Sequence, residues 1–118
     1  MRKIILAAAA LSLITATEAS AHARLLRAAP KAGATVPAPK VLRLSYSETI
    51  VPSASSVTVV SADKKPVATG PIALDAKDKR VVLVPVTAAL APGAYHVSWR
   101  MKTADGHTTD GDFDFKVK

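Results

Sequence analysis

Cysteine is absent from this sequence of 118 residues, which also contains only two methionines and three histidines. Without cysteine the chain cannot form disulfides, zinc ribbons, iron–sulfur clusters, cysteine nucleophiles or blue-copper thiolate sites. Any metal ion must therefore be held by nitrogen, oxygen or methionine sulfur. A Gly-x-Ser-x-Gly element and a glycine-rich phosphate loop are missing as well, so no recognisable hydrolase or nucleotide-binding motif marks the chain as an enzyme.

The first 21 residues have the pattern of a secretory signal. Arg2 and Lys3 precede an apolar run over residues 4–14, and the small residues 19–21 (Ala-Ser-Ala) end the segment. This run is about eleven residues long, whereas a membrane-spanning helix needs roughly 20. We therefore predict that residues 1–21 are a cleaved signal peptide and that residues 22–118 form one domain. That domain is expected to lie in the periplasm with no membrane anchor left after cleavage.

The formal net charge of the whole chain is +7. The basic residues of segment 22–118 are scattered along the sequence, and few aromatic residues lie between them to stack on bases. This distribution favours a solvated surface on a soluble protein and argues against a nucleic-acid partner.

Short segments with a period of two predict strands throughout the domain. In residues 41–46 the apolar side chains of Leu42, Leu44 and Tyr46 share one face. Residues 95–101 alternate in the same way, with Tyr95, Val97, Trp99 and Met101 assigned to the core, as do residues 112–117. Proline- and glycine-containing turn signals separate these runs. The pattern predicts an all-β fold, a small antiparallel β-sandwich of about seven strands. Pro85, at the end of an apolar run over 81–86, predicts an edge or a bulge in its strand.

Two of the three histidines stand where they could bind a metal ion. Cleavage after Ala21 would make His22 the first residue, which supplies both a free α-amine and its own Nδ1 for a chelate ring. His107 follows Asp105 by two residues, so on an extended segment the two side chains would point to the same side. On spacing alone, however, His22 could simply be the residue that follows a cleavage site, and Asp-Gly-His an ordinary polar turn.

Three nitrogens and one oxygen form a donor set that suits square-planar or tetragonal Cu(II), and the Irving–Williams order favours this ion. Zinc and nickel remain chemically open at this point. Affinity should fall with decreasing pH, because copper must displace a proton from an α-amine whose reference pKa is about 7.7 to 8.0.

The remaining polar residues have simpler interpretations. His96 shares its strand face with Ser98 and Arg100, so a surface position is expected. Asp110, Asp112 and Asp114 alternate along one strand. They could suggest a calcium site, but an outer, solvated strand face explains them more simply.

Several segments together resemble one known family, the periplasmic copper resistance proteins of the CopC/PcoC type. The likeness covers essentially the whole of residues 22–118. Its elements are His22-Ala23, then APKAG at 29–33, LSYSE at 44–48, LAPGAYHVSWR at 90–100, ADGH at 104–107 and GDFDFKV at 111–117. Each piece is weak alone, but their order and spacing are specific.

This resemblance implies a Greek-key β-sandwich, cupredoxin-like or immunoglobulin-like, that binds one Cu(II) per chain through His22, Asp105 and His107. An acidic residue near the site of family members matches Glu48, for which an outer-shell role is expected. Some members carry a methionine-rich Cu(I) loop. The matching stretch here, residues 61–79, has neither Met nor His, so no Cu(I) site is predicted.

The sequence thus predicts a monomeric periplasmic Cu(II)-binding protein that is not an enzyme. It would sequester copper or deliver it to an inner-membrane copper transporter or another periplasmic carrier. One alternative is a copper-dependent oxidase with a histidine brace, like the lytic polysaccharide monooxygenases. The other is a metal-free exported β-sandwich that serves as an interaction domain.

Overall fold

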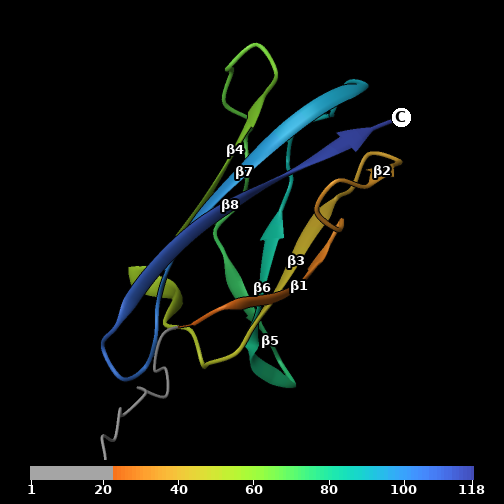
Figure 1. The fold of residues 1–118 in the computed structure, drawn as a ribbon. Coiled ribbons are helices and arrows are strands. Elements are labelled where there is room, and N and C mark those ends of the chain that lie inside the picture. Colours follow the sequence, from red (N-terminus) through yellow and green to blue (C-terminus); the bar gives the residue numbers. More distant parts are fainter. Residues whose placement is uncertain (1–22) are drawn as a thin grey trace, which may run out of the picture.

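The computed structural model describes residues 23–118. Within that segment two four-stranded sheets enclose one core (Figure 1). The strands are β1 (Leu25–Ala29), β2 (Thr35–Val36), β3 (Val41–Tyr46), β4 (Ser56–Ser61), β5 (Ala73–Asp75), β6 (Asp78–Pro85), β7 (Gly93–Lys102) and β8 (Thr108–Val117), with a 3-10 turn, η1 (Pro52–Ala54), before β4. In the described part of the chain, no helix is long and apolar enough to cross a membrane.

The two sheets have the strand orders β1-β3-β6-β5 and β2-β8-β7-β4. All neighbouring strands are antiparallel except β2 and β8, which run parallel. The predicted all-β sandwich is confirmed. Eight strands replace the expected seven or so because β2 and β5, with two and three residues, are too short to show a period in the sequence.

The alternating side chains fill the space between the sheets as predicted. Leu42 and Leu44 of β3 are fully buried, and Val97 and Met101 of β7 face them from the other sheet. Each such side chain contributes about 1.5 to 3 kcal/mol by leaving water. Their burial fixes which face of β7 is turned outward, because successive residues of a strand alternate between faces.

Two aromatic rings of the core lie against each other, and a glycine makes room for one of them. Tyr46 and Trp99 form an edge-to-face pair with ring centroids 5.1 Å apart. Gly111 stands opposite Trp99 in the β7–β8 register. A Cβ atom at position 111 would lie 2.5 Å from Cζ2 of Trp99, so a larger residue could not be accommodated without displacing the indole ring.

Pro85 was expected to mark an edge or a bulge in its strand: the edge is wrong, and the one irregularity in the pairing of β6 with β5, at Leu74/Asp75, lies away from Pro85. β6 lies between β3 and β5 and is an internal strand of its sheet. Pro85 is its last residue, opposite Val41. Because Pro85 ends the strand, its missing N–H removes no hydrogen bond from the interior of the β3–β6 ladder. Proline is therefore tolerated there.

One end of the sandwich brings three distant segments together. β7 and β8 form a long hairpin whose connecting turn lies at the same end of the molecule as the start of β1 and the segment that follows β3 (Figure 1). The sequence-predicted metal ligands within the described residues fall on this turn.

Candidate metal site

The turn between β7 and β8 is closed by a compact set of hydrogen bonds. The Thr103 N–H donates to the carbonyl of His107 over 2.8 Å, and the Gly106 N–H donates to the carbonyl of Thr103 over 2.9 Å. Gly106 has a φ of +94°, a conformation that favours glycine. The segment Asp105-Gly106-His107 is therefore a tight turn whose shape follows from its sequence.

This turn brings Asp105 and His107 together. The Oδ1 atom of Asp105 lies 3.3 Å from Nδ1 of His107. Two donors at about 2.0 to 2.2 Å from one transition-metal ion are about 3 Å apart, so both side chains can reach a single ion. Of the two interpretations that the sequence left open for this segment, an extended strand or a polar turn, the structure shows the turn, and the turn places these two side chains side by side.

Asp105 is held in its ionised form. The Thr103 hydroxyl donates to Oδ1, and this hydrogen bond, followed by one from His107, lowers the pKa of the Asp105 carboxyl below its usual value. About half of each of these two side chains is exposed, 48% for Asp105 and 50% for His107. The pair is thus an anionic oxygen and an imidazole at the protein surface.

The beginning of the described chain is fixed beside this turn. The Thr109 hydroxyl, two residues after His107, donates to the carbonyl of Ala23 over 2.9 Å. The next residue is held as well, because the Arg24 N–H donates to the Ser47 hydroxyl at 2.9 Å. Ala23 is 3% exposed. His22, the predicted N-terminal ligand, lies outside the described residues.

Glu48, the predicted outer-shell residue, belongs to a segment that pairs with the same turn. The carbonyl of Thr49 accepts a hydrogen bond from the N–H of Ala104 over 3.2 Å. Ile50 forms a bridge with Thr103. Glu48 is partly buried and stands one residue before this pairing. Glu48 therefore adjoins the segment that pairs with the residues just before Asp105.

Within residues 23–118, no three His, Cys, Asp or Glu side chains are grouped so that they could hold a metal ion. The described residues supply two of the predicted donors, Asp105 and His107. A complete set of nitrogen and oxygen ligands for Cu(II) would need donors from outside this segment.

His96 lies on the outer face of β7, as expected, but sequence reasoning missed its partners. Its Nδ1 contacts Oδ1 of Asp114 at 2.5 Å, and its Nε2 contacts Oδ2 of Asp112 at 3.1 Å. The hydrogen bond with Asp114 is the main cause that raises the pKa of His96. Asp110 pairs with Arg100 at 3.8 Å. The β7–β8 register accounts for these contacts, and the three aspartates form an outer strand face with cationic partners.

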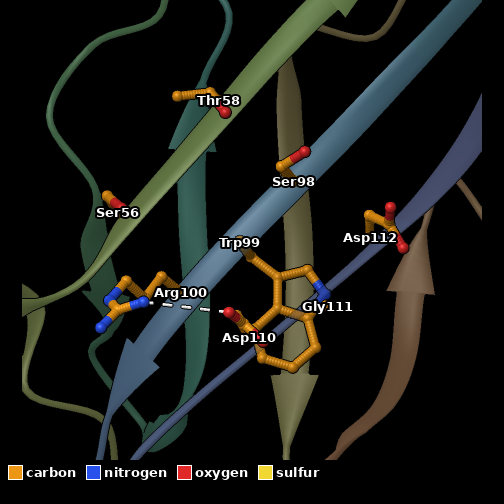
Figure 2. Close-up of a pocket in the computed structure, with 8 residues that line it drawn as sticks. All are labelled: Ser56, Thr58, Ser98, Trp99, Arg100, Asp110, Gly111 and Asp112. Atoms are coloured by element: carbon orange, nitrogen blue, oxygen red, sulfur yellow. Dashed lines mark ion pairs between the residues drawn. The ribbon is translucent and has the colours of Figure 1, made fainter.

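A polar hollow of about 440 Å³ lies on this outer face. It is lined by Ser56 and Thr58 of β4, Ser98 and Arg100 of β7, and Asp110 and Asp112 of β8 (Figure 2). Its lining residues include hydroxyls, a guanidinium and carboxylates but no imidazole. The hollow is therefore distinct in chemistry from the Asp105–His107 pair.

A family model described as the CopC domain matches residues 25–118. The chain belongs to the CopC family. Protein YobA of Escherichia coli K12 is 33% identical over 99 residues, covering 83% of this chain and 80% of YobA.

Two solved structures of CopC-type proteins are similar to the fold described above. The copper resistance protein PcoC from Escherichia coli has a TM-score of 0.76 at 29% identity, covering 83% of this chain and all of PcoC. CopC from Methylosinus trichosporium OB3b has a TM-score of 0.76 at 31% identity, covering 82% and 94% of the two chains.

Membership of the CopC family makes this chain a copper-handling protein. The Asp105–His107 pair is therefore a candidate site for copper. PcoC is described as methionine-rich, whereas this CopC-type chain has two methionines. One of them, Met101, is fully buried in the core, so it is turned away from the surface where the pair lies.

Proposed function

We propose that residues 22–118 form a periplasmic carrier that binds one Cu(II) ion after a signal peptidase has removed residues 1–21. The ligands are the α-amine and Nδ1 of His22, a carboxylate oxygen of Asp105 and the imidazole of His107. Glu48 takes an outer position beside them. Three nitrogens and one oxygen form a tetragonal set that selects Cu(II) among divalent first-row ions.

The observation that carries this proposal is the position of Ala23. His22 is joined directly to Ala23, whose carbonyl is held 2.9 Å from the hydroxyl of Thr109, and Thr109 follows His107 by two residues. A terminal residue attached at this point needs no long linker to reach Asp105 and His107. The family supports copper as the ion, and the adjacency of Asp105 and His107 together with the fixed position of Ala23 supports a site that His22 would complete.

A carrier fits this site better than an enzyme. The chain has five aromatic residues that could form a flat sugar-binding surface. Four of them, Tyr46, Tyr95, Trp99 and Phe115, are at least 92% buried, and the fifth, Phe113, packs against the core. Asp105 would also occupy a position that oxygen activation needs open. Because Asp105 and His107 are about half exposed, an acceptor such as an inner-membrane transporter or a second carrier can approach the ion directly.

The experiment that tests the proposed function is a Cu(II) titration of residues 22–118 against a chelator of known affinity, with metal content measured independently. We expect one Cu(II) per chain, and weaker binding when the pH is lowered from about 7.5 to about 5, because protons compete for the amine and imidazole nitrogens. The absence of stoichiometric binding near neutral pH would contradict the proposal. So would an affinity that does not change with pH.

A further inference from the structure

Thr103 stands out because it is a polar side chain in the interior of the sandwich. It is 2% exposed, while every other residue below 9% exposure in the described segment is apolar or aromatic. A hydroxyl removed from water costs free energy unless it forms hydrogen bonds. The contacts of this hydroxyl therefore indicate what the residue does.

The hydrogen-bond contacts of the Thr103 hydroxyl are with Asp105 and His107, the two proposed ligand residues of the turn. It donates to Oδ1 of Asp105, and it accepts from the backbone N–H of His107 at 3.3 Å. The carbonyl of His107 lies 3.2 Å from the same oxygen. One hydroxyl thus links the carboxylate of the first ligand to the main chain of the second.

Thr103 is itself anchored in the sandwich. It forms a bridge with Ile50, which is 1% exposed, and its neighbour Ala104 donates to the carbonyl of Thr49. The turn that carries Asp105 and His107 projects from this anchor. Asp105 is half exposed and has two rotatable side-chain bonds, so without a fixed partner its carboxylate would sample several orientations.

We infer that Thr103 is a positioning residue that sets the carboxylate of Asp105 and the main chain of His107 in the arrangement that Cu(II) binds. This inference rests on the proposed function. Hydrogen-bond partners that orient metal ligands typically change metal affinity 10- to 100-fold when they are removed. The rival interpretation is that Thr103 only closes the turn and contributes to stability.

Replacement of Thr103 by valine separates these interpretations, because valine keeps the shape and removes the hydroxyl. In residues 22–118, T103V is expected to weaken Cu(II) binding about 10- to 100-fold and to change the electron paramagnetic resonance (EPR) spectrum of the bound ion. Thr103→Ser retains the hydroxyl and is expected to restore both the affinity and the spectrum. Thr58→Val, on the exposed face of β4, is the matched control and should change neither.

A role confined to stability predicts a different result. T103V would then lower the unfolding temperature but bind Cu(II) with the wild-type affinity and spectrum, which would overturn the inference while the proposed function stands. If wild-type residues 22–118 bind no Cu(II), the proposed function fails and this inference fails with it. The wild-type titration therefore distinguishes the two failures.

A second measurement does not depend on the folding of T103V. In the metal-free wild-type protein, the amide proton of His107 should exchange slowly with solvent, because it donates to the Thr103 hydroxyl. In T103S it should remain protected. Rapid exchange of this amide in the wild-type protein would overturn the inference whatever the valine variant does.

Discussion

Replacement of His107 by alanine is expected to weaken Cu(II) binding by about 100-fold or more, equivalent to about 2.8 kcal/mol. In the proposed site, the substitution removes one of three nitrogen donors from the ion. Loss of groups that merely orient a ligand already costs 10- to 100-fold, so loss of a ligand itself should cost at least the upper end of that range. The measurement is a chelator-competition titration of residues 22–118 near neutral pH.

His96→Ala is the matched control for this substitution. His96 lies on the outer face of β7, between Asp112 and Asp114, so its removal should leave Cu(II) affinity within about threefold, a difference of less than 1 kcal/mol. Both histidines are partly exposed, and neither is part of the buried core. Equal losses in the two variants, or no loss in His107→Ala, would exclude His107 from the ligand set.

A single extra residue before His22 is expected to weaken Cu(II) binding by about 100-fold or more, again about 2.8 kcal/mol. The extension converts the α-amine into a peptide amide, which removes one donor and opens the chelate ring while His22 keeps its imidazole. No residue of the sandwich is altered. The comparison is made between residues 22–118 and the same chain preceded by one alanine, Ala21, which stands there in the precursor.

The unfolding temperature of the two metal-free proteins serves as the internal control. It should be nearly identical, because the extension changes no residue of the packed core. If the extended and processed forms bind Cu(II) equally tightly, the α-amine is not a ligand. In that case the ion would have to be held by side chains alone, and cleavage after Ala21 would have no role in forming the site.

Much of the fold could be predicted because the strands of a two-layer sandwich alternate between core and solvent. Tyr95, Val97, Trp99 and Met101 of β7 share a face in the sequence and are all buried in the structure. This alternation does not predict which strands lie next to each other in a sheet. The position of β6 inside its sheet and the parallel pairing of β2 with β8 arise from long-range contacts that no local period records.

The site was predictable in its residue types but not in its geometry. Asp105 and His107 do lie together, but a glycine turn brings them together and not an extended strand. Thr103 was not predicted, because it continues the alternation of Tyr95 to Met101 and so resembles any β-branched residue of a strand. The signal that could have identified it is a hydroxyl two residues before an aspartate, a spacing at which such side chains form local hydrogen bonds. The pairing of His96 with Asp112 and Asp114 required the β7–β8 register.

The most direct test of the central claim is the EPR spectrum of residues 22–118 loaded with one equivalent of Cu(II), recorded with and without ¹⁵N labelling. We expect an axial spectrum from a single tetragonal site with nitrogen couplings from the α-amine and two imidazoles, and a loss of the amine coupling when Ala21 is retained. A spectrum of hydrated copper, or a nitrogen coupling pattern that is the same in the processed and the extended chain, would contradict the account.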